Sequence, residues 1–126
     1  MTALFYWRNN EMKDISGKIQ YKDKEYSLVF NLNVMESIQE EYGTLEKWGD
    51  LTDGKKGEPN AKAVIFGFTQ MINEGIDIEN ENNGTDIKPF TLKQVGRIIT
   101  EIGIAKATAT LNDTVVESTQ SNEKNE

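Results

Sequence analysis

Carboxylates are the only abundant side chains in this sequence that could carry acid–base chemistry. The chain has 21 Asp and Glu residues but no histidine and no cysteine. It therefore lacks the commonest general base, the commonest transition-metal ligand and every thiol reaction. Glu36, Glu40 and Glu41 lie close together, but the spacing of Glu36 and Glu40 places both on the solvent side of a helix. A catalytic pair needs burial that separates the two pKa values, and the sequence does not indicate it. We predict no catalytic residue.

One acidic stretch partly matches the loop of calcium-binding EF-hands. The first, third, fifth and sixth positions of that pattern are matched by Glu79, Glu81, Asn83 and Gly84. The twelfth position, which should supply a bidentate glutamate, is Phe90. We therefore predict an acidic loop or lid over residues 77–88, and no metal site.

Patterns for nucleotide binding and for nucleophilic catalysis are also missing. Neither Gly-x-Gly-x-x-Gly nor a Walker sequence occurs, and residues 54–57 (GKKG) have the wrong spacing. A nucleophilic serine needs a base, and Ser16, Ser27 and Ser37 stand in ordinary strand or helix contexts. The sequence predicts no cofactor and a protein that is not an enzyme; an enzyme that uses carboxylates alone is the remaining alternative.

The net charge of −7 argues against a nucleic-acid partner and against anionic membrane surfaces. The densest basic pairs, Lys22 with Lys24 and Lys55 with Lys56, each lie beside acids. No stretch approaches the roughly 18 apolar residues of a membrane-spanning helix, and residues 3–7 are too short for an export signal. We expect a cytoplasmic protein.

Two short segments near the N-terminal end alternate apolar and polar residues. In residues 15–21 and again in residues 26–32, every second residue is apolar or glycine. Such a pair, separated by a polar break, is typical of an antiparallel β-hairpin with one buried face. The break has no Asn-Gly or Asp-Gly pair, so the type of turn stays open.

Helices are predicted where the apolar period changes to about 3.6 residues. The first should end at Gly43, the third near Gly75, and the last should fray between Gly103 and Leu111. Thr91 and Gln94 match a capping box. The four expected N-caps are Asn33, Thr44, Asn60 and Thr91.

These elements predict an α+β fold, with an N-terminal β-hairpin or small antiparallel sheet packed on three to four helices. We expect one domain over residues 1–111, in which residues 1–14 are an arm or a further strand. Residues 112–126 carry four acids, one lysine and no aromatic side chain, which predicts a disordered acidic tail. The predicted core consists of Ile19, Leu28, Phe30, Leu32, Met35, Ile38, Tyr42, Phe68, Met71, Ile72, Val95, Ile99 and Ile102.

Aromatic side chains are the candidates for a partner-binding surface, because they dominate interface hot spots. Phe5, Tyr6 and Trp7 lie near a terminus, where burial is least assured. Trp48 and Phe66 are further candidates that could equally pack in the core. We predict partner contacts at these five residues.

The middle of the chain resembles the tail assembly chaperones of long-tailed (siphovirus-type) bacteriophages and prophages of Gram-positive bacteria. The resemblance begins with a strand that leads directly into a helix, YSLVFNLNVMESIQEEYG at residues 26–43. It continues with TLEKWGDL, a polar loop, the helix AKAVIFGFTQMINEGI and a last helix, TLKQVGRIITEIG. It covers residues 26–103; residues 1–14 have no counterpart, and the acidic insert at residues 77–88 is longer and more acidic than the family pattern.

The resemblance implies a non-enzymatic assembly factor that binds the tape-measure protein and the tail-tube protein in the cytoplasm of the bacterial host, with possible self-association. An alternative follows from the charge and from the acidic stretch that contains Glu79 and Glu81. It is an acidic phage or mobile-element inhibitor that binds a basic host protein by mimicking nucleic acid.

Overall fold

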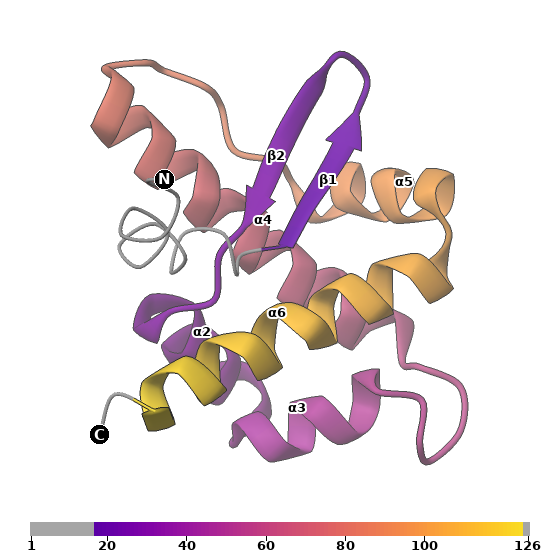
Figure 1. Ribbon diagram of the computed structural model, residues 1–126. Coiled ribbons are helices and arrows are strands. Elements are labelled where there is room, and N and C mark those ends of the chain that lie inside the picture. The colour runs from indigo at the N-terminus through magenta and orange to yellow at the C-terminus, as the bar shows by residue number, and fades with distance from the viewer. Residues whose placement is uncertain (1–16, 125–126) are drawn as a thin grey trace, which may run out of the picture.

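The computed structural model describes residues 17–124. In this part of the chain, a two-stranded antiparallel sheet packs with five helices, which confirms the predicted α+β class and adds a helix to the expected three to four. Helix α4 contacts β2 and each of the other helices, so it forms the centre of the fold (Figure 1). In chain order the elements are β1 (Gly17–Tyr21), β2 (Lys24–Leu28), α2 (Leu32–Tyr42), α3 (Leu45–Thr52), α4 (Ala61–Asn83), α5 (Leu92–Ile102) and α6 (Ile104–Lys124).

The predicted hairpin is present, with its second strand displaced toward the turn. Strands β1 and β2 pair Gly17 with Leu28 and are joined by a two-residue turn. The second strand covers residues 24–28, whereas the alternation predicts residues 26–32. Ile19 and Leu28 are buried on the same face, as the alternation requires.

Helix α2 begins earlier than predicted. Asn31, not Asn33, is its N-cap, and the Asn31 side chain accepts a hydrogen bond from the Val34 amide at 3.2 Å. The predicted burial of Leu32 is therefore wrong: this residue lies in the first turn and is 77% exposed. Val34 and Ile38 form the buried stripe instead, since they lie four residues apart on the side that faces the core.

The other helix boundaries that depend on local capping are largely confirmed. Gly43 closes α2 with a positive φ of 92°, and Thr44 caps α3. Asn60 caps α4, and Thr91 and Gln94 form both hydrogen bonds of the capping box at the start of α5. These motifs satisfy amides within one turn of the chain, so the sequence alone specifies them.

Helix α4 is longer than predicted, because Gly75 does not end it. Gly75 is buried within the helix where β2 passes, and Ile76 after it is also buried. The helix ends at Gly84, whose φ of 68° is left-handed. Residues 77–83 of the expected loop or lid over residues 77–88 are therefore helical.

The fraying expected between Gly103 and Leu111 is wrong, and a further helix, α6, extends beyond residue 112, where the sequence predicts the tail to begin. Gly103 ends α5 with a positive φ of 98°, and α6 begins at once and continues through residues 112–124. Leu111 and Thr114 are buried, and the Gly17 amide donates a hydrogen bond to Thr114 Oγ1 at 3.1 Å. Packing on the hairpin thus stabilises a helix whose own sequence is a poor helix former.

The core contains most of the residues that the sequence predicts. Met35, Tyr42 and Ile102 are partly buried against it rather than fully buried. Predicted residues that are buried are Ile19, Leu28, Phe30, Ile38, Phe68, Met71, Ile72, Val95 and Ile99. Buried hydrophobic residues that the prediction omits are Val34, Trp48, Ala63, Val64, Ile76, Ile98, Ala107 and Leu111.

Candidate functional site

An open groove of about 900 Å³ lies between α4 and α5 and is the best candidate for a functional site. Its apolar lining comes from Ile65 and Phe66 on α4 and from Leu92 on α5. The groove is open to solvent rather than enclosed. Apolar surface gathered in a concave site is typical of ligand and partner binding.

At Gly96, α5 has no side chain beside Ile65 of α4, on one side of the groove. Gly96 faces Ile65, and a Cβ atom added at Gly96 would lie 3.6 Å from Ile65 Cδ1 without a clash. Leu92, in the first turn of α5, is 53% exposed. Thr100 lies one further turn along the same face. Leu92, Gly96 and Thr100 therefore follow one another along the α5 wall of the groove.

Phe66 is held in place by a contact with Tyr42 at the end of α2. The two rings meet edge to face, with 5.7 Å between their centroids. The Tyr42 hydroxyl is shielded from solvent and has no hydrogen-bond partner among the described residues. Burial, together with the nearby Glu41 carboxylate, raises the pKa of Tyr42 above its usual value of 10.0. At neutral pH the ring is therefore uncharged and acts as an apolar support.

The charges around the groove have the opposite sign to the charge of the whole chain. Lys62 from α4, Lys93 and Arg97 from α5, and a single carboxylate, Glu41, line it. The ion pairs of the described residues are Lys24–Glu79 and Lys56–Asp50, so none of the three groove cations takes part in one. The groove is a basic region in a protein of net charge −7.

Two smaller pockets adjoin the groove. One of about 540 Å³ shares Arg97 with it and extends to the hairpin, where the Tyr26 and Phe90 rings meet at 5.2 Å. The other, of about 330 Å³, shares Ile65 and Gly96 and ends at Ile104, which is 46% exposed. The pocket toward Ile104 extends the apolar surface, whereas the pocket toward the hairpin also contains the charged residues Lys22, Asp23 and Lys24.

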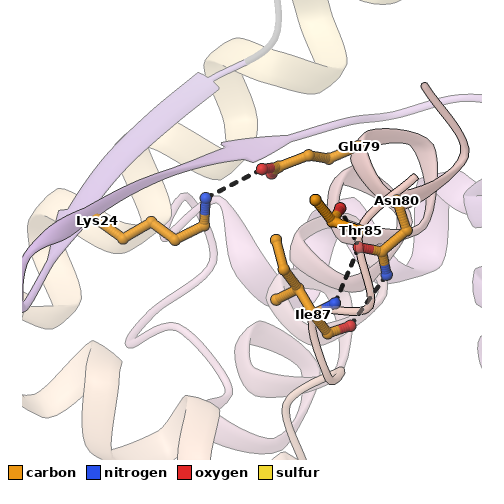
Figure 2. A network of polar contacts seen from close by, with 5 residues as sticks. All are labelled: Lys24, Glu79, Asn80, Thr85 and Ile87. Atoms are coloured by element: carbon orange, nitrogen blue, oxygen red, sulfur yellow. Dashed lines mark hydrogen bonds and ion pairs between the residues drawn. The ribbon is translucent and has the colours of Figure 1, made fainter. Parts of the chain in front are cut away.

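The acidic stretch at the end of α4 is fixed by polar contacts and does not form a lid (Figure 2). Lys24 of the hairpin pairs with Glu79 at 3.1 Å. The Asn80 side chain accepts from the Ile87 amide at 2.9 Å and from the Thr85 hydroxyl at 2.7 Å, and donates to the Ile87 carbonyl at 3.0 Å. One asparagine thus ties the returning chain to the helix.

A second asparagine repeats this arrangement two turns earlier on α4. Asn73 donates to the Phe90 carbonyl at 2.9 Å and accepts from the Phe90 amide at 2.8 Å. Together, Asn73 and Asn80 hold residues 85–90 along α4 and place the start of α5. The polar stretch therefore positions one wall of the groove.

The carboxylates considered for acid–base chemistry do not form a catalytic pair. Glu36, Glu40 and Glu41 are all exposed. In the part of the chain that the structure describes, no group of three or more acidic residues could hold a metal ion. Their positions fit a solvated helix surface.

The aromatic residues predicted to contact a partner have different positions. Phe66 lines the groove. Trp48 is 1% exposed, and its Nε1–H donates to the Ala63 carbonyl at 3.0 Å, so its predicted role as an accessible contact is wrong. Phe5, Tyr6 and Trp7 lie outside the described residues.

The sequence prediction missed the other wall of the groove. Leu92 lies immediately after the N-cap Thr91, three and seven residues before Val95 and Ile99, so the helical period groups it with the buried stripe although it is 53% exposed. Gly96, in an otherwise strongly amphipathic helix, is the local signal that the sequence offers. The exposure of Leu92 depends on how α5 lies against α4, which the capping box does not determine.

Comparison with protein-family models, with curated proteins and with solved structures finds no match to this chain. Within residues 17–124, none of the helices combines the length and the apolar character that crossing a bilayer requires. The geometry of the groove therefore carries the functional inference.

Proposed function

We propose that the chain is a non-enzymatic tail assembly chaperone of a long-tailed bacteriophage or prophage of Gram-positive bacteria. It acts in the cytoplasm of the host cell, where it binds the tape-measure protein and aids assembly of the tail tube. The observation that supports this most is the open apolar groove between α4 and α5. The order of elements over residues 26–103, which resembles that family, supplies the partner.

The groove suits reversible binding of a partner that offers many similar segments. Its apolar side chains, half-buried Phe66 and exposed Leu92, come from two helices, so little order must be gained on binding. A modest affinity for each copy is multiplied when many copies line up on one long protein. Self-association along the partner would strengthen the coating further.

The test is co-expression with the tape-measure protein encoded near this gene, with the soluble fraction of that protein as the measurement. The variant Leu92→Glu places a charge in the groove, and we expect it to lower the soluble fraction at least about threefold, because a desolvated carboxylate opposes docking. Leu32→Glu is a matched control, since Leu32 is also the exposed first residue of an eleven-residue helix but does not line the groove.

A tape-measure protein that stays equally insoluble with and without the wild-type chain would overturn the proposed function. If Leu92→Glu and the wild type solubilise it equally well, the function stands but the groove is not the binding surface. The neighbouring genes give an independent check. A tail-tube gene upstream and a very long tape-measure gene downstream are expected.

The alternative of an acidic inhibitor is supported by exposed carboxylates in the last turns of α4 and just after it, namely Asp77, Glu81 and Asp86. It is weakened because Glu79 is paired with Lys24 rather than presented to a partner. Salt-sensitive binding to a basic host protein that is lost in Glu81→Lys would favour this alternative.

A further inference from the structure

The groove carries the reverse of the charge that the rest of the molecule presents. The whole chain has 14 basic and 21 acidic residues, whereas the groove is lined by Lys62, Lys93 and Arg97 against Glu41 alone. The net charge of the whole chain would favour a basic partner. The groove instead favours a partner that is acidic where it meets the three cations.

The cations lie on both walls of the groove and beside its apolar rows. On α5, Lys93 and Arg97 are four residues apart and run next to the row formed by Leu92 and Gly96. On α4, Lys62 lies one turn before Phe66. An apolar centre with basic edges is complementary to an apolar stripe with acidic edges.

The shape of the groove identifies the kind of segment that fits. It follows two helices, and the stretch from Leu92 to Thr100 spans about 12 Å, or roughly two helical turns. Because it is open, one side of the occupant stays in water. An amphipathic helix satisfies both conditions, since its apolar face fills the groove while its polar face remains solvated.

We infer that the groove binds an amphipathic helix whose apolar stripe is flanked on both sides by glutamate or aspartate. This inference rests on the proposed function as a protein-binding chaperone, and it specifies the chemistry of the segment that the partner offers. The basic edges set the orientation and the choice of segment, while burial of the leucine-type stripe against Phe66 and Leu92 supplies the affinity.

The experiment uses two synthetic helical peptides of about 20 residues that share one leucine stripe. One carries glutamate along both edges of the stripe and the other carries lysine at the same positions. Affinity for the full-length chain is measured by fluorescence anisotropy at low and high salt. We expect the glutamate peptide to bind about tenfold more tightly at low salt, with the advantage shrinking as salt screens the three pairs.

The double variant Lys93→Glu/Arg97→Glu should reverse this preference, because it turns one basic edge acidic. The matched control is Lys18→Glu/Lys47→Glu, which changes the net charge equally at two exposed lysines that do not line the groove. The control should keep the preference for the glutamate peptide. Thermal unfolding of both variants verifies that each is folded.

Tighter binding of the lysine peptide, as the net charge alone would give, would overturn the inference. So would an unchanged preference in Lys93→Glu/Arg97→Glu, or binding of neither peptide. None of these outcomes would by itself overturn the chaperone function, which the solubility of the tape-measure protein tests separately. Loss of that solubilising effect with retained binding of the glutamate peptide would instead overturn the function and keep the chemistry of the groove.

Discussion

Glycines allow close packing on one side of helix α4 and leave open space on the side that faces α5. Toward the hairpin and α3, Gly75 and Gly67 allow direct contact: an added Cβ would lie 2.2 Å from the Ser27 carbonyl oxygen or 2.3 Å from a ring carbon of Trp48. On the side toward α5, the missing side chain of Gly96, which belongs to α5, contributes to the open groove. The first side is complete within the chain, whereas the second stays available for a partner.

The largest effect is expected for Gly75→Ala. The methyl group would overlap the Ser27 carbonyl oxygen, and β2 cannot retreat easily, because the Val29 amide donates to the Met71 carbonyl at 3.1 Å close by. We expect the free energy of unfolding to fall by about 3 kcal/mol, although alanine favours the helix itself. Chemical denaturation measures it. A neutral result would show that the hairpin does not press on α4 here.

A smaller effect is expected for Gly67→Ala, because the obstructing group is a side chain. The Trp48 ring would have to move away from α4, which strains its hydrogen bond to the Ala63 carbonyl. We expect a loss of about 2 kcal/mol and a red shift of Trp48 fluorescence. In a Trp7→Phe background, Trp48 is the sole tryptophan of the chain. Unchanged fluorescence would contradict this packing.

Features that depend on neighbouring residues were predictable from the sequence. The caps at Thr44, Asn60 and Thr91 each close within one helical turn, so the sequence specifies them. At the start of α2, two asparagines compete, and the structure uses Asn31 rather than Asn33. Choosing between them depends on which residues face α4, and local spacing does not contain that information.

Features that depend on distant segments were not predictable. The composition of residues 112–124 indicates disorder, yet Thr114 packs against Gly17, almost a hundred residues earlier in the chain. The groove likewise depends on contacts between segments that are distant in the chain. Phe66 could be singled out as an aromatic residue, but its partner Leu92 is recognised only when α5 is placed against α4. Tertiary contact overrides local propensity at both places.

The smallest effect on stability is expected for Gly96→Ala, and its sign is opposite. The new methyl group would meet Ile65 Cδ1 at 3.6 Å, an ordinary contact, and alanine stabilises a helix relative to glycine. We expect the free energy of unfolding to rise by about 0.5–1 kcal/mol. Thermal or chemical unfolding measures this gain.

Binding measurements on Gly96→Ala test whether the side of α4 that faces α5 has a function. The methyl group of Gly96→Ala would narrow the floor of the groove, so affinity for the helix that docks there should fall while stability rises. Loss of affinity in a more stable protein cannot come from unfolding, which makes this variant a cleaner test than a disruptive one. A variant that is more stable and binds as tightly as the wild type would mean that the partner does not reach Gly96, and the contrast between the two sides of α4 would then be one of packing alone.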